Sequence, residues 1–125
     1  MQILITGGTG FIGAALIPAL LAGGHELIVL SRCAHTDRSR CRYIQSLDQI
    51  SAQTKFGAVI NLAGASLAAR RWNAAYKREI VASRLDTTEQ LLALFKRLEH
   101  CPRILLSGSA VGYYGHHGDV CLTES

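Results

Sequence analysis

Residues 6–13 read Thr-Gly-Gly-Thr-Gly-Phe-Ile-Gly, a Gly-x-x-Gly-x-x-Gly pattern. A short apolar run precedes this stretch and an apolar run with helical spacing follows it, so the glycines lie at a predicted strand-to-helix turn. In that context Gly7 allows a tight turn, Gly10 lets the backbone approach a pyrophosphate, and Gly13 lets the helix pack close to the sheet. Backbone N–H groups at the helix start would face the phosphates. The stretch therefore predicts a dinucleotide-binding loop; the alternative is a glycine-rich turn that holds no ligand.

Outward from this loop, the sequence alternates between predicted strands and helices. The apolar spacing predicts strands over residues 3–5, 26–30, 42–45, 58–62 and 104–106, and helices over residues 11–21 and 73–98. We expect Pro18 to kink or loosen the first helix. The second helix carries an apolar stripe at three- and four-residue steps, made of Val81, Leu85, Thr88, Leu92 and Phe95. This order predicts one α/β domain over residues 1–125, a Rossmann-type doubly wound parallel sheet of about five strands in the order 3-2-1-4-5.

The end of the second predicted strand indicates which dinucleotide is bound. NAD sites usually place Asp or Glu there to hold the ribose 2′-OH. Here the strand ends in Val29-Leu30-Ser31-Arg32, without a carboxylate. The guanidinium of Arg32 suits a 2′-phosphate, and Ser31 could add a hydroxyl donor. We therefore expect NADP(H) in preference to NAD(H), the alternative being that Arg32 is a solvated surface residue.

The composition excludes several classes of protein. A hydrophobic content of 49% with 18% charged residues fits a folded globular domain and not a disordered chain. No apolar run is long enough to span a bilayer, and no signal peptide is evident, so we expect a cytoplasmic protein without a membrane partner. The formal net charge of +4 is consistent with binding nucleic acid, with binding a small phosphorylated ligand, or with no role beyond solubility. Because no aromatic residues interleave a basic face, we expect no nucleic-acid partner.

Metal binding is also not expected. The four cysteines form no Cys-x-x-Cys pair and are expected to be reduced thiols; they are Cys33, Cys41, Cys101 and Cys121. His116, His117 and Asp119 could suggest a metal site, but adjacent histidines rarely point at the same ion.

Further motifs accompany the glycine loop. They are Asn-Leu-Ala-Gly-Ala-Ser at residues 61–66, Arg71-Trp72, Lys77, Ser83-Arg84, and Ser-Gly-Ser-Ala-Val-Gly-Tyr-Tyr-Gly at residues 107–115. Together these segments resemble the extended short-chain dehydrogenase/reductase superfamily. Within it, the chain is most similar to the atypical NAD-dependent epimerase/dehydratase group known as epimerase family proteins, of the YfcH-like type. The resemblance covers essentially all 125 residues.

The resemblance implies roles for individual residues. The segment after the fourth strand passes close to the cofactor, which completes an expected cofactor-binding set of Gly7, Thr9, Gly10, Phe11, Ile12, Gly13, Ser31, Arg32, Leu62, Ala63 and Gly64. Ser109 matches the active-site serine, whose hydroxyl would hydrogen-bond the reacting oxygen of the substrate; the alternative is a serine that caps a loop. Lys77 and Arg84 lie seven residues apart on one helix face, which could meet an anionic substrate or be an ordinary solvated edge.

Two departures from the family pattern affect the expected function. Family enzymes carry a Tyr-x-x-x-Lys pair for proton transfer, and no tyrosine in this chain has a lysine at that offset. Family members also run to about twice this length and end with a substrate-binding region that is missing here. One hypothesis is an NADP(H)-dependent oxidoreductase or epimerase acting on a nucleotide sugar or a similar polar hydroxyl substrate. The other is a non-catalytic NADPH-binding module or a truncated relic without turnover.

The predicted last strand, residues 104–106, is apolar on both faces, and nothing in the sequence is predicted to pair with its outer side. Native proteins protect such edges with charge, proline or a covering element. We therefore expect self-association through this edge.

Overall fold

The computed structural model describes residues 1–109, 115–121 and 123. In this part of the chain, five parallel strands form one sheet in the order β3-β2-β1-β4-β5. The strands are β1 (Gln2–Thr6), β2 (Glu26–Leu30), β3 (Cys41–Ile44), β4 (Ala58–Asn61) and β5 (Ile104–Ser107). The predicted Rossmann-type fold and its strand order are confirmed, with β3 beginning one residue earlier than expected.

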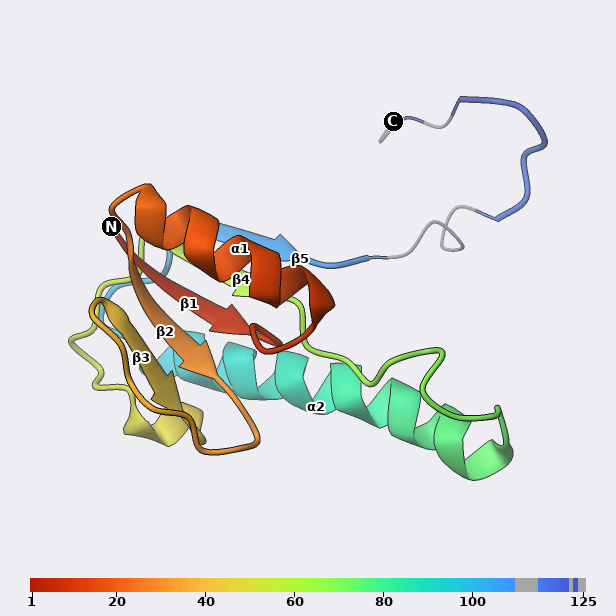
Figure 1. The fold of residues 1–125 in the computed structure, drawn as a ribbon, viewed down its shortest axis with the longest axis horizontal. Helices are drawn as coiled ribbons and strands as arrows, with labels where there is room; N and C mark the ends of the chain where they lie inside the picture. Colours follow the sequence, from red (N-terminus) through yellow and green to blue (C-terminus); the bar gives the residue numbers. More distant parts are fainter. Residues whose placement is uncertain (110–114, 122, 124–125) are drawn as a thin grey trace.

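The two long helices cover opposite faces of the sheet (Figure 1). Helix α1 (Phe11–Ala22) connects β1 to β2, and α2 (Ala74–Arg97) connects β4 to β5. A short 3-10 helix, η1 (Leu47–Gln49), lies between β3 and β4. Side chains alternate along each strand, so the sheet contributes to one core cluster with α1 and to another with α2. This two-sided burial explains why the central strands are apolar without interruption.

Helix α1 continues through Pro18 as a single element. Its apolar residues, Leu16, Ile17, Leu20 and Leu21, are partly buried against the sheet. The C-cap is Gly23, and Gly24 follows with a positive φ of 78°, as expected for a glycine-terminated helix.

Helix α2 buries a different stripe from the predicted one. Its contacts with the sheet come from Leu91 and Leu94, and Leu98 follows at the C-cap; of the predicted stripe, only Phe95 packs against this core cluster. Val81, Leu85 and Leu92, which the apolar spacing singled out, are each more than half exposed. The helix therefore has two apolar sides, and periodicity alone could not say which of them meets the sheet.

Candidate functional site

The glycine loop between β1 and α1 is held against the turn that follows β4. Gly7 has a φ of +69°, and a Cβ atom there would lie 2.5 Å from the carbonyl oxygen of Leu62. A Cβ atom on Gly13 would lie 2.2 Å from the carbonyl oxygen of Gly8. Both positions therefore require glycine, Gly7 for its backbone conformation and Gly13 for the close packing of α1 on the loop.

The N-terminus of α1 offers free backbone donors. Gly10 is the N-cap, with an extended backbone and no side-chain cap, and the first turn contains no acidic residue. The N–H of Gly10 donates to Gly7 O at 3.0 Å, and the first helical bond runs from Ala14 N–H to Gly10 O at 2.9 Å. No acceptor among the described residues takes the N–H groups of residues 11–13. Such a helix start attracts an anion through its donors and its dipole.

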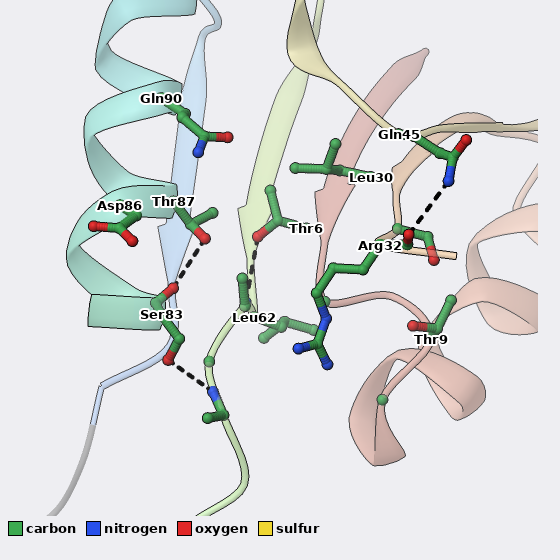
Figure 2. A pocket seen from close by; sticks show the side chains of 16 residues that line it. Thr6, Thr9, Leu30, Arg32, Gln45, Leu62, Ser83, Asp86, Thr87 and Gln90 are labelled. Carbon is green, nitrogen blue, oxygen red and sulfur yellow. Dashed lines mark hydrogen bonds between the residues drawn. The ribbon is translucent and has the colours of Figure 1, made fainter. Parts of the chain in front are cut away.

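A cavity of about 520 Å³ opens at the carboxyl ends of the strands, next to the glycine loop (Figure 2). In a doubly wound sheet, ligands bind at this edge, where the strand order reverses. The glycine loop, the segments after β2, β3 and β4, and one side of α2 form its walls. The lining residues are Thr6, Gly7, Thr9, Gly10, Leu30, Ser31, Arg32, Gln45, Leu62, Ala63, Gly64, Ala65, Ser83, Asp86, Thr87 and Gln90.

Eight of the eleven residues predicted to bind cofactor line this cavity. The other three, Phe11, Ile12 and Gly13, form the first turn of α1. The side chain of Phe11 is 96% exposed and that of Ile12 is 62% exposed, and neither residue lines the cavity.

At the end of β2, Ser31 is buried and Arg32 is exposed. The Ser31 Oγ accepts the N–H of Cys33 at 3.2 Å, which fixes the turn after the strand. Figure 2 shows the Arg32 side chain extending across the mouth of the cavity toward Leu62. Its guanidinium makes no hydrogen bond or ion pair within the described part of the chain, while its carbonyl accepts from Gln45 Nε2 at 3.3 Å. Arg32 therefore places a cation with unused donors at the cavity mouth.

The turn after β4 is fixed from the sheet by Thr6 and Asn61. The fully buried Thr6 Oγ1 donates to Asn61 Oδ1 at 2.5 Å and accepts the N–H of Ala63 at 3.3 Å. The carbonyl of Asn61 accepts the N–H of Gly108 at 2.9 Å, which ties the segment after β5 to the same turn. These bonds hold Leu62 and Ala63 beside the glycine loop.

From the other side, the turn is held by Ser83 and Arg84 of α2. The Ser83 Oγ accepts the N–H of Ala65 at 2.9 Å and donates to Ile80 O at 2.9 Å. The Arg84 Nη1 donates to Ala65 O at 3.4 Å and to Ile80 O at 3.1 Å. A Cβ atom on Gly64 would lie 2.8 Å from the guanidinium carbon of Arg84, so glycine at position 64 lets the arginine lie flat on the turn.

The structure places the remaining predicted site residues outside the cavity lining. Arg84 contacts the turn as described, whereas the Lys77 Nζ lies 5.9 Å from the ring centroid of Trp72, so the two cations have different neighbours. Ser109 is exposed, two residues beyond the end of β5. Tyr113 and Tyr114 lie outside the described residues. The roles of Ser109, Lys77 and Arg84 toward a substrate stay predictions.

Sequence reasoning missed the wall that α2 contributes. Ser83, Thr87 and Gln90 repeat at three- and four-residue steps and form a polar side of the helix, with Asp86 beside them. Such a polar stripe resembles any solvated helix face, so the sequence gives only a weak signal for it. Gln45, which follows β3, was missed because the third strand could be placed only approximately.

Two further findings concern other classes of site. Among the described residues, no three His, Cys, Asp or Glu side chains come together as metal ligands would. Within the same part of the chain, neither helix combines the length and the apolar character needed to cross a membrane.

Comparison with known proteins identifies the family. Residues 3–125 match the family described as the NAD dependent epimerase/dehydratase family. The chain belongs to this family. An epimerase family protein of Staphylococcus haemolyticus is 39% identical over 116 residues, which cover 90% of this chain and 38% of that protein. The epimerase family protein YfhF of Bacillus subtilis is 36% identical over 129 residues, which cover 99% of this chain and 42% of YfhF.

Solved structures agree with the fold and with nucleotide binding in the family. Human epimerase family protein SDR39U1 (isoform 2), solved with NADPH, has a TM-score of 0.76 and 34% identity, covering 91% of this chain and 38% of the human chain. A UDP-glucuronic acid 4-epimerase from Bacillus cereus, solved with UDP-glucuronic acid and NAD, has a TM-score of 0.74 at 21% identity, a likeness of fold alone. The chain thus spans about two fifths of the relatives it matches, corresponding to their nucleotide-binding N-terminal part.

Proposed function

We propose that this chain forms the NADP(H)-binding part of an oxidoreductase of the nucleotide-sugar epimerase/dehydratase type. The proposed preference for NADP(H) over NAD(H) rests on Arg32. Its unpaired guanidinium lies at the mouth of the cavity, where NAD-binding proteins usually have a carboxylate. The human relative solved with NADPH supports the same preference.

The residues present fit a dinucleotide along the whole cavity. The free N–H groups at the start of α1 would hold the pyrophosphate, and Gly10 leaves room for its approach. Arg32 and Ser31 would hold the 2′-phosphate, and Leu30, Gln45 and Gln90 would surround the adenine. When bound, the nicotinamide supplies hydride transfer.

Fewer observations bear on the part of the site that would bind the substrate. A nucleoside-diphosphate sugar epimerase from Corynebacterium glutamicum, 32% identical with a TM-score of 0.69, supports a nucleotide sugar as the substrate class. Ser109, which follows the tethered end of β5, would orient the reacting hydroxyl of the substrate. Lys77 and Arg84 would meet its anionic group.

The second candidate function is a non-catalytic NADPH-binding module. It is favoured by one observation, that no tyrosine in the chain has a lysine four residues later. General acid–base transfer contributes roughly 10²–10⁴ in rate, and nothing in the described site replaces that pair. Turnover of NADPH by the purified chain that is lost in Ser109→Ala would exclude this second candidate.

The cofactor proposal is tested by fluorescence titration of NADPH and NADH against the parent chain, Arg32→Ala and Arg103→Ala. Arg103 is an exposed arginine at the amino end of β5 and serves as the matched control. We expect the parent to bind NADPH roughly 10- to 100-fold more tightly than NADH, since a charge-assisted hydrogen bond contributes about 1.5–3 kcal/mol. Arg32→Ala should remove the preference and Arg103→Ala should keep it. Equal affinities in the parent chain would contradict the proposal.

A further inference from the structure

The guanidinium of Arg32 depends on its own backbone for its position. It makes no hydrogen bond or ion pair within the described part of the chain, so no group there holds the far end of the side chain. Residues 33–37, which follow it, make no backbone–backbone hydrogen bond with any other described residue. The contacts that fix the Arg32 backbone therefore also determine where its charge lies at the cavity mouth.

Two hydrogen bonds fix this backbone from the side of β3. The N–H of Ser31 donates to Ile44 O at 2.9 Å, which continues the parallel pairing of β2 with β3 by one residue. The next carbonyl, that of Arg32, accepts from Gln45 Nε2 at 3.3 Å (Figure 2). Gln45 directly follows β3, so its side-chain amide extends the link between the two strands as far as Arg32.

Gln45 is itself held by the short helix η1. The Gln49 Oε1 accepts the N–H of Gln45 at 2.9 Å and the N–H of Ser46 at 3.3 Å. The second of these bonds belongs to a capping box, in which the Ser46 side chain in turn caps the start of η1. The side chain of Gln49 therefore fixes the backbone from which the Gln45 amide extends.

The helix η1 is anchored to α2 and to the core. Arg97 donates to Leu47 O at 2.8 Å and to Ile50 O at 2.6 Å. Both Leu47 and Ile50 are buried in the core cluster on the α2 face. A continuous series of contacts thus runs from this core, through η1 and two glutamine side chains, to the carbonyl of Arg32.

We propose that Gln45 is a positioning residue for the 2′-phosphate of the cofactor, and that Gln49 acts through it. The inference rests on the proposed role of Arg32 toward NADP(H). With the Gln45 amide in place, the Arg32 side chain leaves its backbone toward the cavity mouth. Without this hydrogen bond the backbone of Arg32 is freer, and the long side chain loses more conformational entropy when a phosphate binds. The effect is confined to NADPH, because NADH has no 2′-phosphate.

The ratio of the two cofactor affinities separates this role from a direct contact. Gln45 also lines the cavity where the adenine would lie. A contact with adenine affects NADPH and NADH alike, because the two cofactors share that ring. Gln49 is not among the residues that line the cavity, so it changes the ratio only through the segment that it holds.

Fluorescence titration of NADPH and NADH against single variants tests the proposal. Gln45→Met keeps the length of the side chain but removes the amide, and Gln49→Met removes the acceptor that holds Gln45; both residues are exposed, so the variants should fold. Gln53→Met is the matched control, because Gln53 Nε2 also donates a hydrogen bond, to Glu99 Oε1 at 2.9 Å, outside the cavity lining. Gln45→Met is also combined with Arg32→Ala.

We expect the NADPH preference to fall roughly three- to tenfold in Gln45→Met, the range that corresponds to one hydrogen bond, and by a smaller factor in Gln49→Met. Gln53→Met should keep the preference. In the Arg32→Ala background, Gln45→Met should not change the ratio further, because the two residues act as one unit.

The possible failures are distinguishable. A parent chain that prefers NADPH, with a Gln45→Met variant that keeps the whole preference, would overturn this inference and leave the proposed function intact. Equal losses of NADPH and NADH affinity in Gln45→Met would also overturn it, since the residue would then contact only the shared part of the cofactor. A parent chain without a preference would overturn the proposed role of Arg32 and this inference together.

Discussion

The Oγ of Ser83, in the first half of α2, accepts the backbone N–H of Ala65 at 2.9 Å, although the two residues belong to different walls of the cavity. The same hydroxyl donates to Ile80 O, so it is held from both sides. Together with Thr6 on the sheet side, this bond determines where the turn at residues 62–65 lies relative to the glycine loop.

Ser83→Ala should therefore weaken NADPH binding without unfolding the domain. The change leaves the N–H of Ala65 without its acceptor, at a cost of about 1 kcal/mol, which corresponds to a roughly fivefold loss of affinity. Isothermal titration calorimetry measures the loss. Thr88→Ala is the control, because its hydroxyl donates to Arg84 O at 2.8 Å on an exposed side of the same helix, away from the cavity lining. Identical affinities for the two variants would show that the Ser83 bond does not position the turn.

Two glycines of the loop should respond to substitution in different ways. Gly10 has a φ of −82°, which any residue adopts, and a Cβ there would lie 3.2 Å from Gly7 O. Gly10→Val should abolish NADPH binding while keeping the helix content, because the side chain occupies the path of the pyrophosphate. Gly7→Ala should instead lower the free energy of unfolding by at least about 2 kcal/mol, because its positive φ and the nearby Leu62 carbonyl exclude a side chain. Circular dichroism and cofactor titration separate these outcomes; retained binding in Gly10→Val would mean that the loop does not hold phosphate.

The four thiols should differ in reactivity. Cys33, Cys101 and Cys121 are exposed, whereas Cys41 is buried in β3, and burial raises the pKa of the Cys41 thiol above its ordinary value. A higher pKa means less thiolate at a given pH, so at pH 8 Cys41 should react with a disulfide reagent at least about tenfold more slowly than the other three. In denaturant all four should react at similar rates. Four equally fast thiols in the folded chain would indicate that β3 is not stably paired.

The chain alone should self-associate through the β5 edge and the exposed apolar side chains beside it, which are Val81, Leu85, Leu92 and Leu105. NADPH should stabilise the folded state. An open apolar edge favours association. A ligand that binds only the folded state stabilises it by about 2.7 kcal/mol at 100 times its Kd, which corresponds to a rise in Tm of roughly 10 °C for a domain of this size. Size-exclusion chromatography with light scattering and a thermal melt, each with and without NADPH, measure both effects.

Leu85→Lys tests whether the chain self-associates through this surface or through another part of the molecule. It should shift the chain toward monomer, while the control Leu67→Lys, in the loop before α2, should not. A parent chain that is monomeric at all concentrations and melts above ~65 °C without cofactor would contradict the prediction.

Local signals were enough to predict most of the fold. The glycine spacing and the apolar spacing predicted every strand and both long helices to within one or two residues, and the strand order followed from the handedness of the connections. Of the eight predicted residues that line the cavity, those in the glycine loop and at the end of β2 followed from the glycine spacing and the missing carboxylate, whereas Leu62, Ala63 and Gly64 followed from the family resemblance. The glycine loop, the apolar spacing and the strand end are local features, because each depends on one turn, on one helix or strand, or on the end of one strand.

What the sequence by itself determined is thus the Rossmann-type sheet, the glycine loop and the place of Arg32. Only the tertiary structure decided which side of α2 meets the sheet, which side faces the cavity and which side stays open. Leu91 and Leu85 have the same hydrophobic character, and their burial differs because the sheet lies on one side of the helix only. In the same way, Arg84 carries a charge that suits an anion, yet its Nη1 donates to the Ile80 carbonyl of its own helix and to the Ala65 carbonyl, which the fold brings within reach in the turn after β4.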